Sequence, residues 1–337
     1  MSEIQMYLTN TAGISSMASF WAFVISGGLR PNADFRKTLL KIATFVMAVG
    51  FIALTLAIVA RGIEAQRFPL SNLWESLLWF AWATMGGYLY IARAYGIQQL
   101  GWLASLTAAT MFLYGSWLPQ SQHEIQPLVP ALVSYWRQIH VPPLIISYAM
   151  FFLAGLAGFI NLFFCGRYVS LACSALAVIL ACTAIQLGTH SKTDAHILQA
   201  LFVGATVFGP LASFLTFRIY SARRMADEKS QKLAAVYDDV GNRCVAIGFP
   251  LLTIGIITGG LWANHAWGSY WSWDPKESMA LVTWLGYAAY IHLRIQQNLS
   301  QEKLSVVLII GLLLTLLTYL GFNSLGFGGL HSYGQFK

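Results

Sequence analysis

The sequence is unusually apolar. Of its 337 residues, 57% are hydrophobic and only 10% are charged, well below the roughly 25% charged residues of a soluble domain. This composition excludes an ordinary soluble protein and predicts an all-α polytopic transmembrane helix bundle. The net charge of +7 does not indicate a nucleic-acid-binding protein, because the Lys and Arg residues are scattered through short loops and form no basic face.

Ten apolar segments are close to the roughly 20 residues that cross a bilayer as a helix. The first is the weakest, being short and rich in Ser and Gly. No internal repeat or low-complexity tract is evident, so we expect one integral membrane domain over residues 1–337. The expected spans are 11–27, 39–60, 71–92, 99–118, 141–164, 168–188, 197–220, 244–262, 275–293 and 304–322.

The basic residues predict the orientation of these spans. If the spans alternate across the membrane, fourteen of the twenty Lys and Arg residues fall on one side, which is therefore the cytoplasmic side. Both termini and the loop after residue 262 are then external, and 221–243 is a polar cytoplasmic loop that could form a short surface helix. The six basic residues on the outer side are Arg61, Arg67, Arg137, Lys192, Lys276 and Lys337.

Cysteine spacing and the N-terminus exclude two further features. The four cysteines form no C-x-x-C pair, so we expect inert buried thiols and no disulfide framework or dithiol redox centre. The first ten residues have no basic region and no small-residue cleavage site, so we expect no cleaved signal peptide.

Two helix starts are encoded locally. Asn72, with Glu75 three residues later, predicts a capping box that opens the third span. Asp274, Pro275 and Glu277 supply an N-cap acceptor, a proline for the first helical position and a glutamate for the third. Capping is our main interpretation of Asp274, with contact to a ligand as a possible second role.

An aromatic segment over 261–277 is the most informative part of the chain. Aromatic residues cluster between two apolar spans, more densely than the interfacial aromatic belt of a membrane protein requires. We interpret the cluster as an external surface for a flat ligand. Its candidate binding residues are Trp262, Trp267, Tyr270, Trp271, Trp273 and Asp274.

Three histidines are candidate iron ligands. His140 and His331 each lie next to a span end on the external side, where two imidazoles flanking an aromatic surface could bind a haem iron from both faces. Zinc suits the chain less well, because H-x-x-x-H and Cys/His clusters are absent. His292 alone falls within a span, where it is either a functional intramembrane histidine or an interfacial residue at a helix C-terminus.

These residues resemble the WWD haem-handling family of cytochrome c maturation proteins, in particular the CcsA (ResC) type of the system II pathway. The signature WGSYWSWDPKE at 267–277 is followed by Trp284, Tyr290 and His292 at the family's spacing. FPLSNLWES, HVPPLIISYA and GLHSYG also look like family motifs. Two features depart from the family. The two spans at 168–220 are an addition to the core that we associate with the family. His265 stands where plastid relatives tend to have an acidic residue, and we interpret it as an accidental neighbour of the site.

The resemblance implies a path for haem b across the membrane. Haem would enter from the cytoplasmic side, pass a transmembrane histidine pair that includes His292, and rest on the WWD segment between His140 and His331. The second transmembrane histidine belongs to a ResB/CcsB-type membrane protein or to a fused N-terminal segment. Because the chain begins close to its first span, we expect a separate partner and an obligate complex.

The implied reaction is thioether formation between the haem vinyl groups and the C-x-x-C-H thiols of apocytochromes c, which thiol-reducing maturation proteins keep available. Three alternatives remain: a haem exporter without synthase activity, a membrane electron-transfer cytochrome and a small-molecule transporter. The motifs favour the synthase, and the single intramembrane histidine and the lack of paired broken helices disfavour the last two. We expect a bacterial inner membrane rather than a thylakoid, because the chain has no transit peptide and has additional spans.

Overall fold

The computed structural model describes residues 2–28, 34–98, 100–128, 132–165, 228–296 and 299–321. All regular secondary structure in these ranges is helical. The expected spans at 168–188 and 197–220 lie outside the described residues, as do His190, His196 and His331.

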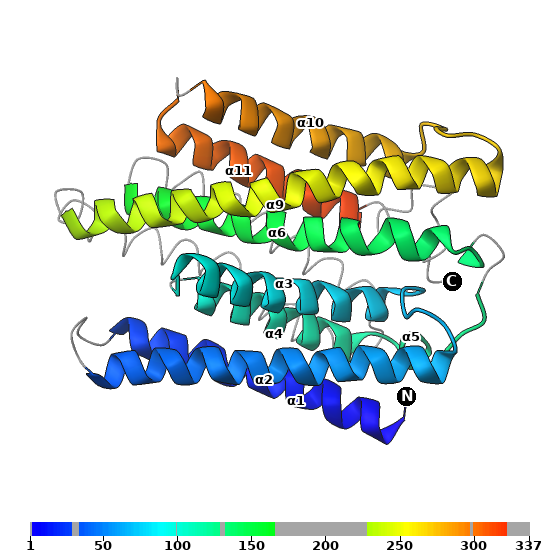
Figure 1. The fold of residues 1–337 in the computed structure, drawn as a ribbon, viewed down its shortest axis with the longest axis horizontal. Helices are drawn as coiled ribbons and strands as arrows, with labels where there is room; N and C mark the ends of the chain where they lie inside the picture. The colour runs from blue at the N-terminus through cyan, green and yellow to red at the C-terminus, as the bar shows by residue number, and fades with distance from the viewer. Residues whose placement is uncertain are drawn as a thin grey trace, which may run out of the picture. The chain divides into compact units, whose positions relative to one another are not determined.

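Helices occupy most of each of the other eight expected spans, within the described ranges (Figure 1). The described chain divides into two compact units, and α6, α9 and α10 each contribute to both. The elements are α1 (Glu3–Gly28), α2 (Asp34–Ala65), α3 (Leu73–Tyr95), α4 (Gly101–Trp117), α5 (Gln120–His123), α6 (Trp136–Cys165), α9 (Glu228–Trp267), α10 (Pro275–Ile295), α11 (Gln301–Leu316) and a π-helical turn (Leu317–Gly321).

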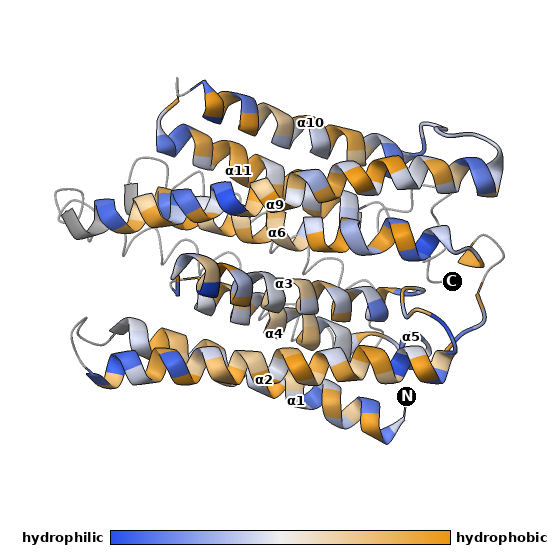
Figure 2. Ribbon diagram, in the orientation of Figure 1, coloured by the Kyte–Doolittle hydropathy of each residue, from blue (hydrophilic) through white to orange (hydrophobic). Residues whose placement is uncertain are grey.

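Four of these helices are long and apolar enough to cross a bilayer. The qualifying stretches are Asp34–Ala65, Trp136–Leu162, Gln231–Trp267 and Gln301–Tyr319. In α2, hydrophobic residues fill the centre and hydrophilic residues gather at both ends (Figure 2). This distribution is that of a helix with its middle in hydrocarbon and its ends in water.

Two helices are longer than their apolar segments. α6 begins at Trp136, five residues before the expected start, so His140 lies in the second turn of a helix and not in the loop. α9 begins at Glu228, and the polar stretch before residue 244 continues directly into the span; it is not a separate surface helix. An Arg243–Asp239 ion pair of 2.7 Å, four residues apart, supports the helix there. Hydropathy therefore located the membrane segment, while the helices extend beyond it.

Among the described residues, the first unit contains 2–28, 34–98, 100–128, 132–153 and 244–281. Within it, α1 packs against α2 and α4, and α3 packs against α4 and α2, so that the four helices lie side by side (Figure 1). Polar side chains join them: the Ser19 hydroxyl donates to the Ala43 carbonyl at 2.8 Å and is 3.2 Å from the Ser105 hydroxyl. Small hydroxyl residues of this kind allow close helix approach in an apolar environment.

Among the described residues, the second unit contains 154–165, 228–243, 282–296 and 299–321. Its buried polar contacts tie α9 to α6 and α10. Asn161 donates its side-chain amide to the Ala234 carbonyl at 2.7 Å, and Arg294 forms a 2.7 Å ion pair with the buried Asp238. The Arg294 pair holds the C-terminal turn of α10 against α9.

Candidate functional site

In the first unit, two glycines bring α6 and α9 unusually close together. A Cβ atom added to Gly255 would lie 2.3 Å from Cδ2 of Leu144, and one added to Gly259 would lie 2.6 Å from Cε1 of His140. Both distances are shorter than real Cβ contacts, so a larger residue at either position would require Leu144 or His140 to shift. The spacing of four residues puts both glycines on one face of α9, as in the G-x-x-x-G packing of membrane helices. Sequence reasoning missed this pair, although the G-x-x-x-G pattern in an apolar span was available as a signal.

The same close approach fixes the ring of His140. Its Nδ1 lies 2.8 Å from the carbonyl oxygen of Gly255. A carbonyl only accepts, so Nδ1 carries the proton and donates it, and the neutral ring then has its lone pair on Nε2. Metal-binding histidines are typically oriented by such a hydrogen bond from the opposite nitrogen. His140 is thus held in the tautomer that suits iron coordination through Nε2.

The aromatic segment begins where α9 ends. Gly268 adopts a φ of +76° directly after Trp267, and its N–H donates to the Asn264 carbonyl at 2.9 Å. This is the usual glycine stop of a helix. The following loop then folds back on α9: a Cβ added to Gly260 would lie only 3.2 Å from the carbonyl oxygen of Tyr270. The loop therefore lies against the same end of α9 that contacts His140.

The tryptophans of this segment have different environments. Trp262 is buried, with its ring centroid 5.5 Å from that of His140, and Trp267 stacks on it at 6.2 Å with 28° between the planes. Trp271 and Trp273 meet edge to face at 88°. Tyr270 and Trp273 are exposed, Trp273 by 71%. The segment thus combines an inner aromatic wall beside His140 with an outer aromatic surface.

Trp273 has an uncommon backbone conformation. Its φ of +58° lies in the left-handed region, which costs a bulky residue roughly 1–3 kcal/mol. The conformation is held by the next residues, because the Glu277 carboxylate accepts from Ser272 N–H at 2.8 Å and from Asp274 N–H at 3.3 Å. Strain of this kind is often retained where a side chain must be presented in one direction.

Asp274 caps α10 as the sequence predicted. Its Oδ1 accepts from the N–H of Lys276 at 2.9 Å, and Glu277 reaches back to the N–H of Asp274. Together these contacts form a capping box. Asp274 is also nearly buried, with 6% of its surface exposed. The cap therefore anchors the C-terminal end of the aromatic loop to the start of α10.

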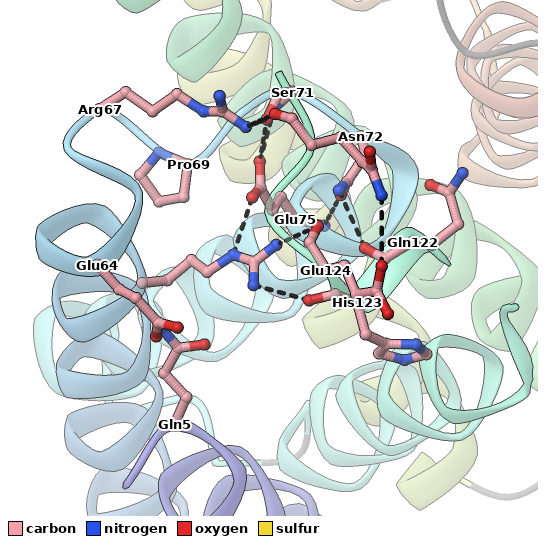
Figure 3. A network of polar contacts seen from close by, with 12 residues as sticks. Gln5, Glu64, Arg67, Pro69, Ser71, Asn72, Glu75, Gln122, His123 and Glu124 are labelled. Atoms are coloured by element: carbon pink, nitrogen blue, oxygen red, sulfur yellow. Dashed lines mark hydrogen bonds and ion pairs between the residues drawn. The ribbon is translucent and has the colours of Figure 1, made fainter. Parts of the chain in front are cut away.

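A buried ion pair, which sequence reasoning missed, stands at the start of α3 (Figure 3). Arg61, from the last turns of α2, donates Nε to Oε1 of Glu75 at 3.0 Å, and both side chains are 1% exposed. Its other two nitrogens donate to the carbonyls of His123 at 2.7 Å and Glu124 at 3.0 Å. One guanidinium thereby connects α2, α3 and the segment after α4.

Asn72 completes this network and corrects one expectation. Its Oδ1 accepts from the N–H of Glu75 at 2.9 Å, as the capping box required, and its Nδ2 donates to the Gln122 carbonyl at 3.0 Å. The Glu75 carboxylate, however, accepts from the N–H and hydroxyl of Ser71, both at 2.7 Å, and not from the N–H of Asn72. The reason is Arg61, which takes the other carboxylate oxygen and turns the side chain toward Ser71.

The remaining described histidines lie elsewhere. His292 is exposed near the C-terminal end of α10, in the second unit, two residues before Arg294. His265 is exposed on the last turn of α9, with its ring centroid 6.4 Å from that of Tyr135. His123 approaches the Gly115 carbonyl through Nε2 at 3.0 Å and meets Trp74 edge to face, which is a local structural role. Of the predicted iron ligands, the structure therefore brings His140 alone next to the aromatic segment within the described residues.

The comparisons with known proteins agree with these motifs. Residues 70–330 match the cytochrome c assembly protein family. The chain is 36% identical over 327 residues to the cytochrome c biogenesis protein CcsA of Cyanophora paradoxa, covering 96% of this chain and 97% of the relative. The chain belongs to the CcsA-type cytochrome c biogenesis family. It is also 35% identical to CcsA of Synechococcus elongatus, over 89% of each chain, and 34% identical to CcsA of Synechocystis, over 99% of this chain and 98% of the relative.

This membership confirms the resemblance drawn from the sequence, and with it a role in cytochrome c maturation at a membrane. Glu75 of the buried ion pair lies near the start of the matching region and within the FPLSNLWES segment.

Proposed function

We propose that this CcsA-family chain is the haem-handling subunit of a membrane holocytochrome c synthase of the system II type. Haem b is its transported substrate, and apocytochromes c are the acceptors. The observation that carries the proposal is the setting of His140, whose Nδ1–H donates to Gly255 and whose ring lies beside Trp262. An oriented imidazole against an aromatic wall suits an iron porphyrin.

The indole N–H of Trp262, next to His140, is consistent with a bound haem. The indole N–H of Trp262 is buried and has no hydrogen-bond partner among the described residues. Buried donors are nearly always satisfied in proteins, so an unmet one beside the oriented imidazole indicates a place where a ligand group belongs. In this proposal His140 and His331 are the two external iron ligands, and the segment 261–277 is the external surface on which the porphyrin rests.

Each part of the segment has a role in positioning the substrate. Trp262 and Trp267 form the wall next to the imidazole. Tyr270, Trp271 and Trp273 provide further aromatic surface, and Asp274 anchors the loop to α10. The haem supplies the vinyl carbons to which the cysteine thiols of the apocytochrome add. The protein's contribution is to hold the porphyrin in one orientation, so that the vinyl groups and the cysteine thiols meet in the geometry that the reaction requires.

The transmembrane part of the proposal assigns His292 to a second haem site. His292 is exposed on the surface of this chain, which is the arrangement required if the second ligand comes from another protein. We assign that protein to the ResB/CcsB type, with thiol-reducing maturation proteins acting on the apocytochrome. The ten spans, the external position of the aromatic segment and of both termini, and a bacterial inner membrane belong to the same proposal.

The test is the absorption spectrum of the complex purified with its partner in mild detergent. We expect co-purified haem with six-coordinate, low-spin bands. His140→Gly should lose these bands and regain them when imidazole is added, while His123→Gly, a matched change of a locally bonded histidine, should leave them unaltered. Wild-type complex without haem, or His140→Gly with the wild-type spectrum, would contradict the proposal.

A synthase is distinguished from a haem exporter by its product. The synthase proposal requires thioether-linked cytochrome that remains coloured after denaturation and acid–acetone extraction. Extractable haem delivered to the outer face without such a product would identify an exporter.

A further inference from the structure

Arg137 is a buried cation whose charge is unmatched. Its side chain is 2% exposed, and its one hydrogen bond within the described part of the chain is a long one of 3.4 Å from Nη2 to the Phe68 carbonyl. Nε and Nη1 are buried and have no partner among the described residues. A guanidinium does not lose its proton at any physiological pH, so burial without an anion is costly. Such a residue calls for a counter-ion that the described residues do not supply.

A second arginine lies in the same area. Arg67 donates Nη2 to the Gln126 carbonyl at 2.6 Å and to the Ser71 hydroxyl at 3.2 Å, while its Nε is buried and lacks a partner in the described residues. Among the described residues, Arg67 and Glu75 act on the charge of Arg137 electrostatically, Arg67 unfavourably and Glu75 favourably. The area therefore contains two guanidinium groups with buried, unsatisfied N–H donors.

The nearby carboxylate cannot neutralise them. Glu75 is engaged on both oxygens, by Arg61 at 3.0 Å and by the N–H and hydroxyl of Ser71 at 2.7 Å each. Arg61 and Glu75 cancel each other's charge, which leaves Arg67 and Arg137 with a net charge of +2 and no carboxylate within ion-pair distance among the described residues.

Arg137 is also positioned relative to His140. The two residues are three apart on α6, so they share a face of the helix with Cβ atoms roughly 5–6 Å apart. The Gly255 carbonyl holds the His140 ring through Nδ1 and leaves Nε2 as the nitrogen with the lone pair, and the N–H of Trp262 beside it has no partner among the described residues. A ligand whose metal binds His140 would therefore have its periphery within reach of a long arginine side chain one turn away.

We infer that Arg137, assisted by Arg67, binds the carboxylate groups at the edge of the haem whose iron is held by His140. A haem carries two such carboxylates, which match the two unneutralised guanidinium groups in number and sign, and an arginine fork suits a carboxylate in geometry. This inference rests on the proposed function and adds to it the element that fixes the rotation of the porphyrin about the iron axis. Fixing that rotation sets where the vinyl groups face.

The experiment compares two probes on the purified complex with its partner. Iron protoporphyrin IX and its dimethyl ester have the same ring and iron, but the ester has no carboxylate charge. Wild type should bind the free acid roughly 10- to 100-fold more tightly than the ester, as expected for charge-assisted hydrogen bonds. Arg137→Gln should reduce this preference at least several-fold while keeping the six-coordinate spectrum with both probes. Arg93→Gln, an exposed arginine at the other end of α3, is the matched control and should retain the full preference.

Two results would overturn the inference: a wild type that binds both probes equally, or an Arg137→Gln variant that keeps the wild-type preference. If Arg137→Gln reduces the yield of folded complex, Arg137→Lys provides the second variant, and it should retain a weakened preference because it keeps the charge but loses the fork. Failure of the proposed function is a separate result, since wild type would then show no six-coordinate spectrum with either probe.

Discussion

The contact between Gly259 and His140 yields the sharpest structural prediction. In Gly259→Ala, the new Cβ would lie 2.6 Å from Cε1 and 2.8 Å from Nδ1 of His140, whereas ordinary contacts begin at 3.4 Å. The ring must move by about 0.8 Å or α6 must separate from α9, and either change stretches the 2.8 Å hydrogen bond from Nδ1 to Gly255. Losing the group that orients a metal ligand costs roughly 10- to 100-fold in metal affinity. We expect the affinity for haem, measured by titration of the purified complex, to fall by that factor.

The cause can be separated from general damage to the helix. Gly13→Ala is the control, because a Cβ there would lie at an ordinary 3.5 Å from Phe112. In a His140→Gly background, Gly259→Ala should cost much less, since the ring it displaces is gone; this double-mutant cycle isolates the pairwise contact. The reasoning is refuted if Gly259→Ala binds haem with wild-type affinity and spectrum, or if its cost is unchanged when His140 is absent.

Three further predictions concern the fold around the site. Glu75→Gln should destabilise the protein by about 3–5 kcal/mol, because it leaves the buried Arg61 without its counter-ion. Lys37→Gln, which changes an exposed ion pair, is the control. Equal midpoints of thermal unfolding for the two variants would contradict the account. Trp273→Gly should lower haem affinity without lowering the unfolding temperature, since it relieves a left-handed backbone and removes an exposed ring; a large loss of stability would show that the ring is structural. Asp274→Ala should destabilise the fold by about 1 kcal/mol through loss of the α10 cap, and Asp274→Asn should recover most of the loss; no recovery would assign the carboxylate a role beyond capping.

The parts of the fold that the sequence predicted depend on local or compositional signals. The apolar segments located the helices because bilayer thickness fixes their length, and Asp274 and Glu277 marked the start of α10 because capping involves neighbours only three residues apart. The starts of α6 at Trp136 and of α9 at Glu228 were missed. Outside the hydrocarbon region, a polar residue can lie within a helix as readily as in a loop, so hydropathy does not mark where the helix begins.

The parts of the site that were missed depend on contacts between distant residues. Arg61 and Glu75 are fourteen residues apart, and each alone looks like a loop charge or a cap. The contact of Gly259 with His140 spans more than one hundred residues, and composition does not indicate which helices meet. Arg137 was counted only as an outer-side charge, because its burial and its unmet donors appear only when α6 lies against the segment before α3. Trp262 and Trp273 were grouped in one surface, whereas their exposures differ widely.

The most direct test of the central claim is covalent cytochrome formation in cells. The chain would be co-expressed with its ResB/CcsB-type partner and a C-x-x-C-H apocytochrome in a host that lacks its own maturation system, and haem-stained protein would be measured after denaturing electrophoresis. The account predicts covalent haem with the wild-type pair, little with His140→Ala, and recovery of His140→Gly when imidazole is added to the medium. Covalent haem at wild-type levels in His140→Ala, or its absence in the wild-type pair when both proteins are inserted in the membrane, would contradict it.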